Sequence, residues 1–123
     1  MQNKPFNFGP VAMSSTLTTN ILNPAITSLA GPVGFTATQP YILLRHIRIV
    51  NKTSGAVTFS LWKGAAGANA AGTEVVGIGK SIAANDSYDW YGLMRFDAAD
   101  FLVGGAGAAT SLSIQGEGEI GFV

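Results

Sequence analysis

Apolar and polar residues alternate through residues 41–62, YILLRHIRIVNKTSGAVTFSLW, on both sides of a short polar segment that contains glycine. Alternation with a period of two, interrupted by such a segment, is typical of a half-buried antiparallel β-hairpin. The stretch therefore predicts two paired strands. The expected faces are Leu43, Arg45, Ile47 and Ile49 against His46 and Arg48 in the first strand, and Val57, Phe59 and Leu61 against Thr58, Ser60 and Trp62 in the second.

Short alternating segments recur along the rest of the chain and are separated by turns rich in glycine, alanine and aspartate. Residues 25–40, with several glycines and prolines, predict turns and one short strand. Residues 87–92, SYDWYG, place Tyr88 and Trp90 on one face of a strand and Tyr91 on the other. Seven or eight short strands without a convincing helix predict an all-β fold, a single-domain antiparallel β-sandwich that resembles a jelly roll.

Residues 1–10, MQNKPFNFGP, contain two prolines and two phenylalanines without a clear period. This composition predicts an extended N-terminal arm, with the β-sandwich domain formed by residues 11–123. Phe6 and Phe8 share one side of such an arm. They either tuck onto their own domain or contact a partner.

The charge balance limits the partners that this chain can attract. Seven Lys and Arg residues match seven Asp and Glu residues, and the charged fraction of 11% lies well below the roughly 25% of ordinary soluble domains. Electrostatic attraction to nucleic acid or to a membrane surface is therefore not expected. Few charges and a hydrophobic fraction of 47% indicate instead that neighbouring subunits cover part of the surface.

No arrangement of residues predicts catalysis. The chain has no cysteine, which excludes disulfides, Cys-based zinc sites and Cys nucleophiles. The segment Gly79-Lys80-Ser81 resembles the end of a phosphate-binding loop, but Glu74 stands where that motif needs glycine. His46 has no recognisable nucleophile beside it. The chain is therefore not expected to be an enzyme or to hold a cofactor or metal. Its paired carboxylates are Asp86 with Asp89, Asp97 with Asp100, and Glu117 with Glu119, and the Asp side chains among them are expected to cap turns.

Large aromatic side chains on the expected strands exceed what one small core needs, and such residues are the usual anchors of protein interfaces. Trp62 is either an anchor between subunits or is covered by a loop of its own chain. An exposed aromatic platform formed by Trp62 and Tyr91 could instead stack on sugar rings, as in a carbohydrate-binding module. The interface candidates are Phe6, Phe8, Arg48, Trp62, Tyr88, Trp90 and Tyr91.

Three segments, RHIRIVNKTSGAVTFSLWKGAAG, SIAANDSYDWYG and GEGEIGFV, resemble small structural proteins of tailed bacteriophage virions. The shared pattern is a strand ending in Asn, a Thr/Ser turn, a Val-Thr-x-x-Leu strand, an Ala/Gly loop, an Ile-Ala-Ala-x-x-Ser-Tyr turn and a terminal Gly-x-Glu strand. Residues 47–51, 57–64, 82–88 and 116–119 occupy these places. Within this group, the chain is most similar to capsid decoration (cement) proteins.

The resemblance implies a homotrimer that sits where capsomers meet on the capsid exterior and clamps neighbouring major capsid proteins. Such a protein is made in the host cytoplasm and becomes part of the virion. No catalytic residues follow from the resemblance. A tail, neck or fibre component of the same particle and a carbohydrate-binding module are the alternative functions.

Overall fold

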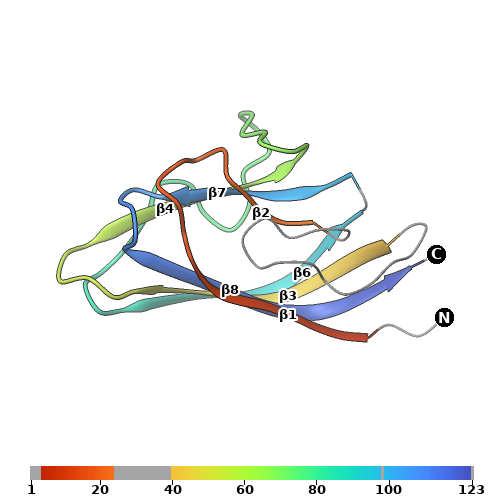
Figure 1. Cartoon of the computed structure of the whole chain (residues 1–123), viewed down its shortest axis with the longest axis horizontal. Coiled ribbons are helices and arrows are strands. Elements are labelled where there is room, and N and C mark those ends of the chain that lie inside the picture. The colour runs from red at the N-terminus through yellow and green to blue at the C-terminus, as the bar shows by residue number, and fades with distance from the viewer. Residues whose placement is uncertain (1–3, 24–39, 98, 123) are drawn as a thin grey trace.

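The chain folds into two antiparallel sheets that pack face to face (Figure 1). The computed structural model describes residues 4–23, 40–97 and 99–122, so the short strand expected within residues 25–40 lies outside the described residues. In the described ranges there is no helix, and the predicted all-β sandwich is confirmed. The strands are β1 (Lys4–Ala12), β2 (Asn20–Leu22), β3 (Pro40–Asn51), β4 (Val57–Gly64), β5 (Lys80–Ile82), β6 (Ser87–Phe96), β7 (Phe101–Ala106) and β8 (Leu112–Phe122).

One sheet has the strand order β1-β8-β3-β6 and the other has the order β2-β7-β4-β5. In Figure 1 the first sheet is the lower layer and the second is the upper layer. Seventeen hydrophobic side chains from the two sheets and the adjoining loops form one core cluster: Phe8, Met13, Ile21, Leu22, Ile42, Leu44, Ile47, Ile49, Phe59, Leu61, Ile82, Phe96, Leu102, Ala106, Leu112, Ile114 and Ile120. Phe59 and Leu61 were predicted to share the buried face of their strand, and this is confirmed.

The strands on either side of residues 52–56 belong to different sheets, so the hairpin predicted for residues 41–62 is wrong. β3 pairs with β6 and β8, whereas β4 pairs with β5 and β7. Each strand has one apolar face, as predicted. In a sandwich these two faces meet across the core instead of lying side by side in one sheet.

Asn51 holds the corner where the chain passes from one sheet to the other. Its side chain is fully buried, and its Nδ2 group donates to the carbonyl oxygens of Gly55, Ile82 and Ala83 at 2.9, 3.0 and 3.2 Å. Its Oδ1 atom accepts hydrogen bonds from the backbone N–H and the hydroxyl of Thr53. Because Ile82 belongs to β5, this one buried amide joins the two sheets.

A bulge in β3 changes the predicted alternation. Leu44 and Ile47 are both fully buried, and the register shifts between Leu44 and His46. Arg45 and His46 therefore both lie on the outer face, and Leu43 lies there too because its two neighbours in the chain point inward. The prediction that Leu43 and Arg45 share one face with Ile47 and Ile49 is wrong, whereas the prediction that His46 and Arg48 lie on the face opposite Ile47 and Ile49 is confirmed.

The predicted N-terminal arm is an edge strand of the lower sheet. Residues 4–12 form β1, which pairs with β8, so the boundary expected after residue 10 falls inside a strand. Phe8 is 4% exposed and belongs to the core, and Phe6 packs beside it with ring centroids 6.3 Å apart. Of the two possibilities left open, the structure supports the one in which both rings pack on their own domain.

Glycine in β8 makes room for this packing. A Cβ atom at position 116 would lie 2.5 Å from Cε1 of Phe8 and 2.7 Å from the carbonyl oxygen of His46. Real side chains do not approach so closely, so only glycine fits beneath the Phe8 ring without a rearrangement. Glycine at this position therefore lets the Phe8 ring pack directly over β8, next to its ladder partner.

Candidate functional site

Trp62 is buried under a loop of its own chain. Its side chain is 5% exposed, and its ladder partner Val103 is fully buried, although neither belongs to the core between the sheets. The segment after β4 folds back over this outer face. The Gly67 N–H donates a hydrogen bond to Oδ1 of Asn20 at 2.6 Å, and the backbone of Glu74 forms an isolated β-bridge with that of Trp62. The structure therefore supports burial under a loop and not an anchor between subunits.

Tyr88 and Trp90 face the core from β6. They pair with Ile49 and Ile47, two fully buried residues, and both are half-buried against the core cluster. The Tyr88 ring also contacts Phe59, with ring centroids 5.6 Å apart. Their common face was predicted and is confirmed, but neither presents a freely exposed ring.

Tyr91 is the interface candidate that stands out on the surface. It is 71% exposed on the outer face of β6, and Leu93 of the same strand is 62% exposed. The Tyr91 ring lies on the imidazole of His46, with ring centroids 4.6 Å apart and 9° between the planes. Arg48, the other surface candidate, lies one row further along β3 and pairs with Asp89.

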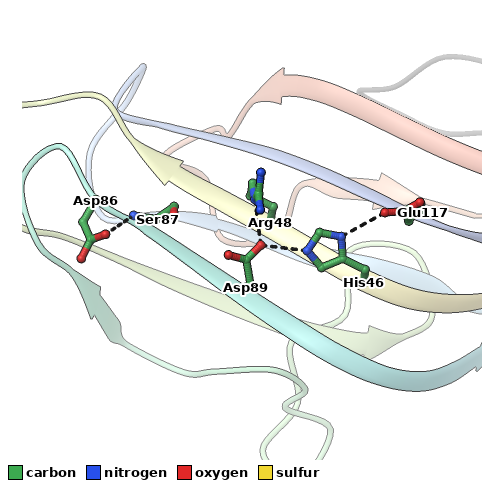
Figure 2. Close-up of polar contacts among 6 residues, drawn as sticks. All are labelled: His46, Arg48, Asp86, Ser87, Asp89 and Glu117. Carbon is green, nitrogen blue, oxygen red and sulfur yellow. Dashed lines mark hydrogen bonds and ion pairs between the residues drawn. The ribbon is translucent and has the colours of Figure 1, made fainter.

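Asp89 lies between two nitrogen donors, as Figure 2 shows. Its Oδ1 atom is 2.8 Å from Nε of Arg48 and 2.8 Å from Nε2 of His46. The hydrogen bond from Arg48, followed by that from His46, lowers the pKa of Asp89, and the bond to Asp89 raises the pKa of Arg48. This carboxylate therefore fixes the positions of both neighbouring side chains.

His46 contacts a second carboxylate through its other ring nitrogen, with Nδ1 3.3 Å from Oε1 of Glu117 (Figure 2). A neutral imidazole can donate to only one of two carboxylates, whereas the protonated ring can donate to both. Arg45 binds Glu119 in the next row, at 3.0 Å. The charges on this face are thus paired with one another across β3, β6 and β8.

A groove of about 490 Å³ opens on this outer face, above β8. β1 bulges away from β8 at Gly9 and Pro10 and forms one rim, and β3 bulges at His46 on the other side. The residues that line the groove are Asn7, Phe8, Gly9, Pro10, His46, Arg48, Tyr91, Gln115, Gly116 and Glu117. These side chains can stack, donate hydrogen bonds and accept them, so the groove has the chemistry of a binding site.

A smaller groove, about 190 Å³, lies on the outer face of the other sheet. Leu17, which is 40% exposed, borders it, and Ser60 lies in its wall. The Ser60 hydroxyl accepts a hydrogen bond from the Gly79 N–H, next to Ile78, which is 55% exposed. No charged side chain lines this groove, whose residues are Ser15, Leu17, Thr58, Phe59, Ser60, Gly105, Ala106 and Gly107.

The segment that resembles a phosphate-binding loop has a structural role. Lys80 and Ser81 lie in strand β5 instead of preceding a helix. The Lys80 ammonium lies 4.8 Å from the centre of the Tyr88 ring, so its charge is directed to an aromatic face of its own domain.

The paired carboxylates cap turns only in part. The Asp100 carboxylate accepts a hydrogen bond from the Asp97 backbone N–H, as predicted for a turn. The prediction is wrong for Asp89, which lies in β6 and pairs with Arg48. Glu117 and Glu119 lie in β8 and pair with His46 and Arg45.

Among the described residues, no group of three His, Asp or Glu side chains is placed to hold a metal ion. The same part of the chain contains no helix of the length and hydropathy needed to cross a membrane. No known protein-family description matches the chain, and no curated protein is significantly similar to it. The function must therefore be argued from the fold, the two outer faces and the resemblance in sequence pattern.

Proposed function

We propose that this protein is a virion structural subunit that binds the exterior of a bacteriophage capsid as a decoration protein and stabilises the head. The sequence pattern that resembles cement proteins supports this proposal, as does the β-sandwich fold. The low charge supports it as well, because a surface with few charges is readily covered by a neighbour. The homotrimer implied by the resemblance is part of the proposal.

The outer face of the β2-β7-β4-β5 sheet is the surface we assign to the major capsid protein. Leu17 and Ile78 are exposed there, and the groove beside Leu17 has no charged lining. Removing water from this groove requires no charge to be stripped of its hydration, in contrast to the ion-paired face opposite. The groove without charged lining residues, together with the exposed Leu17 and Ile78, is the observation that carries the proposal. A stable contact needs at least about 1,000 Å² of buried surface, so the loops around the groove are expected to take part.

This assignment revises the anchors expected from the sequence. Phe8 and Trp62 are buried, and Phe6 and Trp90 pack on the core of their own domain. Their side chains already bury most of their apolar area within the subunit. The binding free energy is therefore assigned to the exposed aliphatic residues Leu17 and Ile78.

Two measurements on particles test the decoration role. Virions that lack the protein are expected to release their DNA at a lower temperature than complete virions. Mass spectrometry of complete virions is expected to find a copy number for this protein of the same order as that of the major capsid protein. Equal heat stability of the two kinds of particle would contradict the role, and a copy number set by tail symmetry would favour a tail, neck or fibre component.

Matched variants test the docking face. The double variant L17D/I78D is expected to lose binding to stripped capsids by about tenfold or more, because two charges must be desolvated in the contact. L93D places one such charge on the opposite sheet, at a residue with similar exposure, and is expected to bind normally. Loss of binding in L93D but not in L17D/I78D would contradict this docking face.

A further inference from the structure

We propose that the groove above β8 binds a neutral pyranose unit of a polysaccharide, with Tyr91 as its stacking platform. The inference goes beyond the decoration role and does not depend on it, because the groove lies on the sheet opposite the proposed capsid contact. It retains Tyr91 from the carbohydrate-binding alternative and replaces Trp62, which is buried.

Tyr91 is held in place for stacking. One face of its ring is covered by the His46 imidazole, yet the residue is 71% exposed, so the opposite face is open to water. The His46 imidazole in turn lies between two carboxylates, with Nε2 2.8 Å from Oδ1 of Asp89 and Nδ1 3.3 Å from Oε1 of Glu117. An aromatic ring held in this way loses little conformational entropy when a ligand packs on it. The C–H face of a pyranose is a suitable partner for such a ring.

The groove supplies hydrogen-bonding groups next to the ring. Asn7 and Gln115 contribute carboxamides, which both donate and accept, and the Glu117 side chain, 68% exposed, contributes a carboxylate that accepts. Sugar hydroxyls likewise donate and accept. A volume of about 490 Å³ also falls in the usual range for small-ligand sites, roughly 300–1,000 Å³.

The charge pairing indicates a neutral ligand. Arg48 is bound by Asp89, and His46 lies between Asp89 and Glu117. An anionic ligand would compete with these carboxylates for the same donors, and a cationic ligand would compete with Arg48 and His46 for the carboxylates. A neutral sugar can use the remaining lone pairs and N–H groups without breaking the pairs.

The test uses the full chain on an array of bacterial polysaccharides and their neutral and acidic oligosaccharide fragments, followed by calorimetric titration with the fragment that binds best. Wild type is expected to bind neutral fragments. Y91A is expected to weaken that binding by about tenfold or more, a loss in the range measured for aromatic side chains that stack on nucleic-acid bases. Y91F, which keeps the ring, is expected to stay within about threefold of wild type.

L93A is the matched control, because it removes an exposed apolar side chain from the same strand outside the groove lining. It is expected to bind sugar as wild type does, and Q115A in the groove is expected to bind more weakly. An array without signal, binding that survives Y91A, equal losses in Y91A and L93A, or preference for acidic fragments would overturn the proposal. Loss of capsid binding in Y91A, together with an empty array, would overturn it in favour of a protein contact.

Discussion

The side-chain nitrogen of Asn51 lies 3.0 Å from the carbonyl oxygen of Ile82, and this hydrogen bond joins β3 of one sheet to β5 of the other. The same amide also binds Gly55 and Ala83. Asn51 is fully buried, so replacing it by an apolar residue would leave the buried carbonyl of Ile82 without this hydrogen bond.

We therefore expect Asn51→Ala to lower the free energy of unfolding by about 1–3 kcal/mol. Thr53→Ala, which removes a half-buried partner of the same side chain, is expected to have a smaller effect. Urea denaturation of the two variants measures the difference. Unchanged stability in Asn51→Ala would show that the buried amide does not stabilise the corner.

Asp89 makes the free energy of unfolding depend on pH at acidic pH values. Hydrogen bonds from Arg48 and then His46 lower the pKa of Asp89 below its ordinary value of 3.8. A lowered pKa in the folded state favours the carboxylate, so this contribution is complete above the unfolded pKa and is lost as the pH falls through the folded pKa. D89N is therefore expected to be less stable than wild type at neutral pH, with the difference shrinking below pH 3.8. Urea denaturation over this pH range checks the expectation.

R48M is the companion variant because it keeps the Asp89 carboxyl and removes its first hydrogen-bond donor. The pKa of Asp89, followed by NMR of its carboxyl carbon, is expected to rise toward 3.8 in R48M. An unchanged pKa would mean that Arg48 does not hold Asp89 in solution.

The two tryptophans differ in their access to solvent. Trp62 is 5% exposed, whereas Trp90 is half-buried at the edge of the core. In W90F, where Trp62 is the remaining tryptophan, acrylamide is expected to quench fluorescence less strongly than in W62F. Stronger quenching in W90F than in W62F would contradict burial of Trp62.

W62A is expected to lower the free energy of unfolding by about 3–5 kcal/mol, as large-to-small changes at buried aromatic sites do.

Gly116→Ala tests the contact between the Phe8 ring of β1 and the neighbouring strand β8. The added methyl group would lie 2.5 Å from Cε1 of Phe8, and the strain is expected to cost about 1–3 kcal/mol of stability. In the F8L background the loss is expected to be smaller, which a double-mutant cycle measures. Gly55→Ala is the control, because its added methyl group would meet no atom of a non-adjacent residue within 4 Å. Equal losses for Gly116→Ala in both backgrounds would contradict the contact.

Alternation was sufficient to predict strands but not to predict their neighbours. It identified the buried face of Phe59 and Leu61 and the outer position of His46, because a period of two follows directly from strand geometry. It could not distinguish a hairpin from a corner between sheets, since both leave one face of each strand buried. It also missed β1, where the bulge at Gly9 and Pro10 interrupts the pattern.

The candidate groove was predictable only in part. Tyr91 stood out in the sequence because it alternates with Trp90 on a strand that already supplies core residues. The contact between His46 and Asp89 depends on the register of β3 with β6, and the rim at Asn7 depends on pairing between β1 and β8. Such long-range register is set by the whole fold and has no local signature.

The position of β8 has a consequence for synthesis on the ribosome. β8 follows all the other described strands in the chain, yet it lies between β1 and β3, and β1 pairs with β8 alone among these strands. The nascent chain therefore carries β1 without its partner until the segment around Ile120 has been translated, and this high contact order predicts slow completion of the sheet. During that interval the unsatisfied edge of β3 is open to pairing with another chain, so chaperone binding or rapid assembly should matter most while β8 is still missing.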